Sequence, residues 1–344
     1  MSFDLLPLYP RDRAEVIRLF TQYPYKTWQK RVQGIDPHRL AQLLWDLAEP
    51  QFGRPRTITG VAWRQEPREA VGFIMMAPHA WHSEVFSRSM GRILHLVNYV
   101  EPATVGRLLL DSLLADARRA GIEHLACRVD GQDWPNVHLL ESYGFQCVDC
   151  SLKLARRLDD LPATNAESPD DIEIRPFEPP DLEALQQIAA RSHTYNHFFN
   201  DPHLPRDRAK VLFQQWLARC AGGAASSILV AADADAQIVG FVTVLSSAAL
   251  ARVVGVSVGI IDYIVVDRSR ERQGIGRRLL RAALRSLARD GHQWVELRAS
   301  QDNYQALAFY CANRFQIVGS DIIFHRWEPP PQGDPKDRKA TRRP

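Results

Sequence analysis

The sequence predicts an α/β (α+β) fold in two tandem domains, and three observations support that prediction. A chain of 344 residues with 45% hydrophobic content is long enough to bury two cores. Between residues 260 and 318, apolar strand-like runs alternate with helical runs in the order strand, glycine turn, long helix, strand, short helix, strand. Finally, the chain carries a diverged copy of the same pattern in its first half.

The glycine-bearing turn at residues 265–280 is the most informative segment. The apolar run 260–266 predicts a strand, and apolar residues recurring from Ile275 to Leu287 predict a helix directly after the turn. A helix N-terminus offers unpaired backbone N–H groups and the positive end of the helix dipole, and Gly274 lets an anion approach the main chain. Because arginines flank the turn, we expect it to bind a diphosphate rather than a lone carboxylate.

The segments that follow the turn are equally characteristic. Residues 292–298 predict a strand, Asn303 to Tyr310 a short helix, and 315–318 a further strand. From about residue 171 to 327 this order resembles the acetyl-CoA core of the GNAT N-acetyltransferases. The resemblance implies a mixed, mostly antiparallel sheet flanked by helices. The chain departs from the family pattern at Glu271, the first position of the glycine loop, and at Arg314, where a glycine is usual.

The first half repeats the second at a nearly constant spacing. Gly106 precedes Gly276 by 170 positions, Phe145 precedes Phe315 by the same 170, and 71–73 matches 239–241 at an offset of 168. We therefore predict two tandem GNAT-like domains, at residues 1–156 and 172–328. The polar composition of residues 157–171 predicts a linker, and the basic segment 329–344 is predicted to be a disordered tail.

The first copy lacks the residues that the chemistry needs. Its turn, residues 99–106, is acidic and without a basic pair; Asp133 stands in place of Asn303, and Leu140 in place of Tyr310. Since leucine can neither donate nor accept a proton, we expect the N-terminal domain to be degenerate and to shape one wall of the acceptor site. That this half also binds acetyl-CoA stays open as the alternative.

Composition narrows the classes of partner. The net charge is +3, from 43 basic and 40 acidic residues, and so small an excess does not favour nucleic acid as a binding partner. No apolar run approaches the roughly 20 residues that cross a bilayer, and the start of the chain does not resemble a signal peptide, so we expect no membrane partner. Five scattered cysteines suit a reducing cytoplasm, and no metal is expected. The sequence leaves a homodimer open.

Acetyl transfer to an amine needs a proton donor for the leaving thiolate and an acceptor for the ammonium proton. The resemblance gives the donor role to Tyr310, whose phenol is protonated at neutral pH. The candidate base is Asp262, a carboxylate inside an apolar strand, with Glu296 or a chain of waters as alternatives. Asn303 is similar to the residue that contacts the pantetheine arm, with a helix N-cap as its alternative role. The remaining acetyl-CoA contacts are expected at Ile264, Val265, Val266, Arg272, Gln273, Gly274, Ile275, Gly276 and Arg277.

The acceptor is expected to contact residues 192–210, which are rich in aromatic, imidazole and amide groups that suit a polar, ring-shaped ligand. The expected contacts are His197, Phe199, Asp201 and Glu296. This segment is similar to a stretch of the dTDP-fucosamine acetyltransferases, which acetylate a nucleotide-linked amino sugar. The resemblance implies an acetyl-CoA-dependent N-acetyltransferase for a small amine, foremost an amino sugar or a nucleotide-linked one. The alternatives are another small amine (an aminoglycoside, a polyamine or a thiol precursor) and a non-catalytic acyl-CoA-binding protein.

Overall fold

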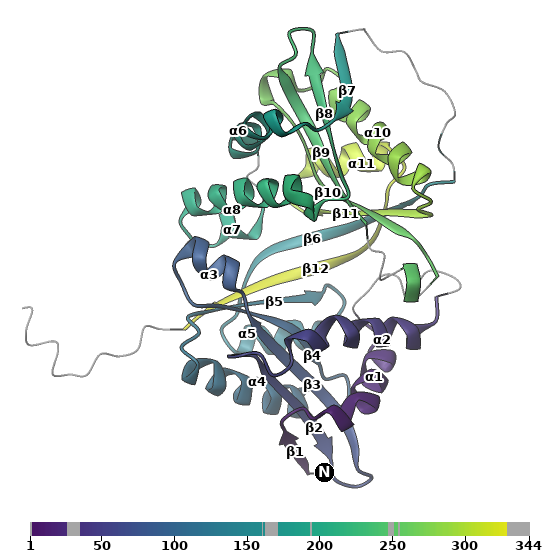
Figure 1. The fold of residues 1–344 in the computed structure, drawn as a ribbon. Helices are drawn as coiled ribbons and strands as arrows, with labels where there is room; N and C mark the ends of the chain where they lie inside the picture. The colour runs from purple at the N-terminus through teal and green to yellow at the C-terminus, as the bar shows by residue number, and fades with distance from the viewer. Residues whose placement is uncertain are drawn as a thin grey trace, which may run out of the picture.

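One continuous twelve-stranded sheet runs through the molecule (Figure 1). The computed structural model describes residues 2–25, 35–159, 161, 171–192, 195–246, 251–253 and 255–328. The strand order is β1-β2-β3-β4-β5-β12-β6-β11-β10-β9-β8-β7. Every neighbouring pair is antiparallel except β4–β5 and β10–β11, which are parallel. The predicted mixed, mostly antiparallel sheet with flanking helices is therefore confirmed.

The first half supplies the strands at one end of the sheet. Its strands are β1 (Phe3–Leu6), β2 (Ile58–Arg64), β3 (Glu69–Pro78), β4 (Met90–Val97), β5 (His124–Asp130) and β6 (Gln146–Arg157). Its helices are η1 (Pro10–Asp12), α1 (Arg13–Gln22), α2 (Pro37–Ala48), η3 (Glu49–Gln51), α3 (Ala80–Phe86), α4 (Pro102–Arg119) and α5 (Trp134–Ser142).

The second half follows the same order. Its strands are β7 (Ile172–Pro176), β8 (Ser227–Asp233), β9 (Ile238–Ser246), β10 (Val258–Val266), β11 (Trp294–Ser300) and β12 (Gln316–Trp327). Its helices are η4 (Pro179–Asp181), α6 (Leu182–Ser192), α7 (His197–Asn200), α8 (Arg206–Arg219), η5 (Cys220–Ala224), η6 (Arg268–Arg270), α10 (Ile275–Arg289) and α11 (Tyr304–Ala312).

The internal repeat is visible in the elements themselves. Strands β5 and β11, helices α5 and α11, and strands β6 and β12 begin and end 170 positions apart. The two halves nevertheless exchange their last strands, because β6 lies between β11 and β12, and β12 lies between β5 and β6. The domain boundaries at residues 156 and 172 stay a prediction. The tail and most of the linker, 160 and 162–170, lie outside the described residues.

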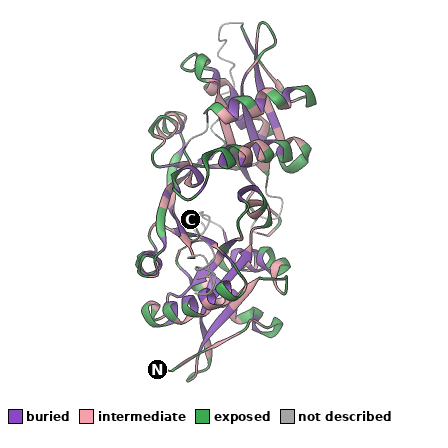
Figure 2. Cartoon of the chain, turned by 90° about the vertical axis from the view of Figure 1, so that its left-hand side faces the viewer, coloured by how far each residue is buried: buried purple, intermediate pink, exposed green. Residues whose placement is uncertain are grey.

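Helices cover both faces of the sheet in each half. In the first half, α4 and α5 pack on one face, and α1 and α2 on the other. Strand β3 serves both cores because successive side chains alternate: Phe73 and Met75 enter one, Ile74 and Met76 the other. In the second half, α10 and α11 cover one face, and α6 and α8 the other. Figure 2 shows the resulting pattern, with buried strands inside and exposed outer helix faces.

The long helix after the glycine turn forms as its periodicity predicts. In α10, Ile275, Leu279, Leu280, Ala283, Leu284 and Leu287 are all buried against β8, β9 and β10. This apolar stripe fixes the helix N-terminus at the end of β10. Among the helices that the structure describes, none combines the length and apolar character needed to cross a bilayer.

One departure from the family pattern is explained by backbone conformation. Arg314, which stands where a glycine is usual, has a φ of 67° and so adopts the left-handed conformation itself. Its counterpart in the first half is Gly144, with a φ of 77°. The turn before β12 therefore keeps its shape despite the substitution, at a backbone cost of roughly 1 kcal/mol.

Candidate active site

Strands β10 and β11 stop pairing midway along β10. Their parallel pairing runs from Val258 opposite Trp294 to Ile261 opposite Leu297 and then stops, although β10 continues to Val266 beside β9. The register of β10 against β9 shifts between Ile261 and Tyr263, and this irregularity contains Asp262. The carboxylate thus lies where the two strands begin to diverge.

A cavity of about 340 Å³ occupies this divergence. Strands β10 and β11 form two of its walls, and α11, α8 and the start of α7 form others. We call it the transfer cavity. Six residues predicted from the sequence line it together: His197, Asp262, Ile264, Glu296, Asn303 and Tyr310.

Asp262 has the environment of a proton acceptor. Burial raises the pKa of its carboxyl, while the hydrogen bond from Trp216 and the charge of Arg298 act in the opposite direction. The indole Nε1 of Trp216 donates to Oδ2 over 2.6 Å, which fixes the orientation of the carboxylate in the cavity wall. Trp216 was not expected from the sequence, where it looks like an ordinary apolar position of α8.

Tyr310 faces the same cavity from α11. Only 6% of the residue is exposed, and its ring packs edge-on against Phe315 at 5.7 Å. Burial raises the pKa of the phenol above its ordinary value of 10.0. The hydroxyl is therefore protonated throughout the physiological range, as a proton donor must be.

Asn303 both caps helix α11 and lines the transfer cavity. Its Oδ1 accepts a hydrogen bond from the backbone N–H of Ala306 over 3.1 Å, so the side chain caps α11, which is the alternative role considered above. The residue also lines the transfer cavity. The capping bond uses the amide oxygen and leaves the amide nitrogen as the group that a ligand would meet.

The glycine turn lies between the end of β10 and the start of α10. Gly274 is the N-cap of α10 with a φ of 81°, and no side chain caps this helix. A Cβ placed on Gly274 would have no atom within 4 Å, so the space in front of the helix N-terminus is open. Arg272 also adopts a left-handed conformation, with a φ of 62°. These features fit the phosphate groups of a CoA molecule, held by backbone N–H groups.

The other residues predicted for the cofactor fall into three groups. Ile264 lines the transfer cavity, and Ile275 is buried in the core, so the latter contributes only through its backbone. The rest occupy the strand end, the turn and the first helical turn without lining the transfer cavity: Val265, Val266, Arg272, Gln273, Gly274, Gly276 and Arg277.

The predicted acceptor residues separate in the structure. His197 and Glu296 line the transfer cavity. Phe199 instead is buried and stacks on Phe213 at 5.9 Å, and Asp201 is 3% exposed; neither lines this cavity. Phe199 and Asp201 therefore support the site from behind its wall.

The histidine segment has partners that sequence spacing did not reveal. His197 Nδ1 lies 3.0 Å from His325 Nε2, and His325 Nδ1 lies 2.6 Å from Asp201 Oδ2. Trp327 Nε1 donates to the same carboxylate oxygen over 3.0 Å. Burial, followed by the charges of His325 and Arg128, lowers the pKa of His197 well below 6.5, so its imidazole is neutral. Its partner His325 comes from β12, 128 residues after His197 and 124 residues after Asp201.

The same carboxylate and two histidines include the donor types of a metal site. His124, Asp201 and His325 each place one ligand atom within 4.8 Å of the others. A tetrahedral zinc ion with bonds near 2.0 Å would hold neighbouring ligand atoms roughly 3.3 Å apart. Since His325 Nδ1 and Asp201 Oδ2 are only 2.6 Å apart, this arrangement is that of a hydrogen bond.

A comparison with family models identifies the domain that contains this site. Residues 182–313 match the model of the acetyltransferase (GNAT) family. The matched range begins with α6 and ends just after α11, and so contains the transfer cavity's β10 and β11, the glycine turn and Tyr310. The chain contains a GNAT acetyltransferase domain.

Two curated proteins are similar over most of the chain. The spore coat polysaccharide biosynthesis protein SpsD of Bacillus subtilis (strain 168) is 24% identical over 259 residues, which are 74% of this chain and 84% of that protein. The mycothiol acetyltransferase of Clavibacter sepedonicus is 28% identical over 241 residues, 64% of this chain and 68% of that protein.

Solved structures share the tandem architecture. A GCN5-related N-acetyltransferase from Sphaerobacter thermophilus superposes with a TM-score of 0.63 at 18% identity, covering 95% of this chain and 96% of that one. A tandem GNAT protein from the clavulanic acid biosynthesis pathway gives 0.59 at 15% identity, covering 96% and 99%. At these identities the similarity establishes the fold, including both halves of the GNAT tandem.

The first GNAT-like half has different residues where its strands β4 and β5 diverge. Leu94 occupies the position of Asp262, 168 residues earlier, and Leu140 that of Tyr310, 170 residues earlier. Tyr23 reaches into the region where β4 and β5 diverge; its hydroxyl hydrogen-bonds to Asp133 and accepts from Asn136 Nδ2 over 3.1 Å. Only about 10 Å³ of free space remains beside Tyr23.

Proposed function

We propose that this protein is an acetyl-CoA-dependent N-acetyltransferase whose acceptor is a small amine, foremost an amino sugar or a nucleotide-linked amino sugar. The observation that carries the proposal is the pairing, across one cavity, of a carboxylate with a raised pKa and a protonated phenol. These are the two groups that amine acetylation requires. The similarity to a protein of spore coat polysaccharide biosynthesis supports a sugar acceptor.

Acetyl-CoA, when bound, supplies the acetyl thioester that the acceptor amine attacks. The backbone N–H groups from Arg272 to Gly276, with Arg277 in support, would hold its diphosphate. Backbone N–H groups within Ile264 to Val266, at the end of β10, would polarise the thioester carbonyl.

Proton transfer is the work of two side chains. Asp262 accepts a proton from the acceptor's ammonium group and so releases the lone pair for attack. Tyr310 donates its phenolic proton to the sulfur as the carbon–sulfur bond breaks, and the second proton that the nitrogen loses on becoming an amide restores the phenol. Glu296, which lines the same cavity, is the alternative proton acceptor. The first half, with leucine at both equivalent positions and Tyr23 in its gap, takes no part in proton transfer.

A second candidate acceptor rests on the similarity to a mycothiol acetyltransferase. On that reading the substrate is the free amine of a thiol precursor, and the catalytic residues are the same. The five described cysteines are free, which suits a reducing cytoplasm as the place of reaction.

A panel of amine acceptors tests the proposal. The full chain is incubated with acetyl-CoA and, separately, a nucleotide-linked amino sugar, a free amino sugar, a polyamine, an aminoglycoside and a thiol precursor amine, and thiol release is followed. We expect turnover with an amino sugar. Turnover confined to polyamines or to the thiol precursor would reject the sugar assignment. If calorimetry detects no binding of acetyl-CoA, the assignment as an acetyltransferase is rejected.

A further inference from the structure

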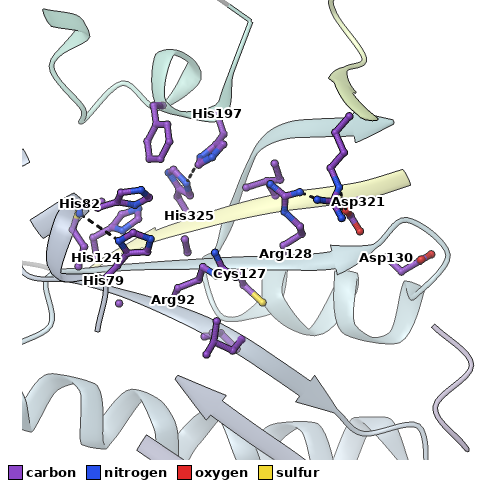
Figure 3. A pocket seen from close by; sticks show the side chains of 18 of the residues that line it. His79, His82, Arg92, His124, Cys127, Arg128, Asp130, His197, Asp321 and His325 are labelled. Carbon is purple, nitrogen blue, oxygen red and sulfur yellow. Dashed lines mark hydrogen bonds and ion pairs between the residues drawn. The ribbon is translucent and has the colours of Figure 1, made fainter. Parts of the chain in front are cut away.

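A second cavity, of about 420 Å³, adjoins the transfer cavity (Figure 3). We call it the chamber. The two cavities share four lining residues, Arg128, His197, Arg298 and Ile323. The chamber's other walls come from α3, β4, β5, α7 and β12, so both halves of the chain contribute. A ligand whose amine reaches Asp262 has room for its remaining groups here.

The chamber is the first half's counterpart of the transfer cavity. Its residues on β4 and β5 occupy the positions that line the transfer cavity on β10 and β11. Arg92, Leu94 and Arg128 correspond to Ile260, Asp262 and Arg298, at separations of 168, 168 and 170. Because Tyr23 fills the cofactor end of this cleft, only its acceptor end remains open.

The chamber carries excess positive charge. Four cationic side chains line it, Arg92, Arg128, Lys153 and Arg298, against two carboxylates, Asp130 and Asp321. The formal charge of the lining is thus four minus two, or +2, with histidines neutral. The carboxylate of Asp321 is shared, since it lies 2.7 Å from Lys153, 3.6 Å from Arg128 and 3.7 Å from Arg298.

Arg92 is the cation most clearly available to a ligand. It is exposed to the chamber, and no other residue that the structure describes forms a hydrogen bond or ion pair with it. Burial, and then the charge of Arg298, lowers the pKa of Arg92. The same two causes lower the pKa of Arg128 to about 10. The guanidinium groups repel one another, and a bound anion would relieve that repulsion.

The histidines add neutral hydrogen-bonding groups. Burial, reinforced by neighbouring positive groups, lowers the pKa of His79 to about 4, of His82 to about 2 and of His124 to about 3. Neither ring nitrogen of His124 has a hydrogen-bond partner within the described part of the chain, although its side chain is only 2% exposed. A buried imidazole without partners is unfavourable unless a ligand or water satisfies it.

We propose that the chamber binds a diphosphate carried by the acceptor, with Arg92 and Arg128 as its principal contacts. Guanidinium groups match phosphate oxygens in geometry and charge, and a diphosphate carries the two negative charges that the lining lacks. This assignment rests on the proposed function and makes it more specific, because it selects a nucleotide-linked amine over a free one.

Binding is tested without catalysis, by titrating inorganic pyrophosphate into the full chain saturated with CoA, which occupies the glycine turn. The variants are Arg92→Gln, Arg92→Lys and, as a matched control, Arg119→Gln, an exposed arginine on α4. We expect Arg92→Gln to weaken pyrophosphate binding roughly 10- to 100-fold, Arg92→Lys to weaken it less, and Arg119→Gln to have no effect. Equal affinity in wild type and Arg92→Gln, or no binding by wild type, overturns the proposal.

Kinetics separate this inference from the proposed function. For a nucleotide-linked amino sugar, Arg92→Gln is expected to raise KM by the same 10- to 100-fold while leaving KM for acetyl-CoA unchanged. With a free amino sugar the variant and wild type should match. If the variant and wild type also have equal KM for the nucleotide-linked sugar, the diphosphate site is wrong. If pyrophosphate binding depends on Arg92 but no amine is acetylated, the anion site stands and the proposed function falls.

Discussion

Replacing Tyr310 with phenylalanine separates catalysis from stability. The phenol lies in the wall of the transfer cavity, and within the described residues its hydroxyl has no hydrogen-bond partner. Removing the phenolic oxygen therefore breaks no hydrogen bond within the described part of the chain and leaves the packing of the ring against Phe315 intact. We expect the free energy of unfolding to change by less than about 0.5 kcal/mol.

The loss of a proton donor has a much larger effect on the rate. General acid catalysis contributes roughly 10²- to 10⁴-fold, which at 1.36 kcal/mol per decade is about 3 to 5 kcal/mol of activation free energy. Because burial raises the pKa of Tyr310, the wild-type kcat should hold to a pH above the ordinary tyrosine value, 10.0, before ionisation of the phenol reduces it. Stopped-time thiol release and thermal unfolding measure the two quantities on the same preparations.

The control lies on the same helix. Tyr304 is 75% exposed on α11, so Tyr304→Phe should leave both kcat and Tm at wild-type values. If Tyr310→Phe retains kcat within a factor of about two, the phenol is not the proton donor. A loss of unfolding free energy as large as the increase in activation free energy would likewise show that Tyr310 acts through packing.

Three further substitutions test the carboxylate, the turn and the support behind the histidines. Asp262→Asn should lower kcat/KM about 100-fold and remove the acidic limb of the pH–rate profile, which in wild type lies above the ordinary carboxyl pKa because desolvation raises the pKa of Asp262. Stability at pH 7 should not fall, because a carboxyl whose pKa is raised on folding opposes folding when it is ionised. Gly274→Ala should cost about 1 kcal/mol and weaken CoA binding in calorimetry, because φ is 81° there. Burial alone would raise the pKa of Asp201, but hydrogen bonds from β12 lower it to about 2. In urea unfolding, Asp201→Asn should therefore be about 2 kcal/mol less stable at pH 6, and the difference should disappear as the pH falls from about 4 to 2; a constant difference would rule out the ionised carboxylate as its source.

Local patterns were enough to predict the strand, turn and helices around Gly274. The apolar stripe of α10, the glycine at its N-cap and the short helix that carries Tyr310 are each encoded within a few turns of the chain. The nearly constant spacing between the two halves likewise predicted that the second half repeats the elements of the first. These features depend on neighbours in sequence, which a sequence displays directly.

The acceptor side depends on contacts that a sequence does not display. His325 contacts Asp201 from 124 positions away, and it does so only because β12 crosses into the first half of the sheet. No periodicity in β12 indicates that exchange, since a strand of the same pattern would serve equally well beside its own half. Asp201 was predicted to contact the acceptor because it lies in the aromatic-rich segment 192–210, and in the structure its carboxylate hydrogen-bonds to His325 and Trp327 of β12.

The strand exchange gives the first half a structural role, but it does not account for the side chains in the chamber. Completing the sheet requires backbone hydrogen bonds from β5 and β6, which almost any residue compatible with a strand can supply. It does not require a lysine that is 6% exposed, Lys153, or an arginine without a partner in the described chain, Arg92. Clustered cations repel one another, and Asp130 and Asp321 compensate only part of this set. The remaining charge is accounted for by an anion that binds in the chamber.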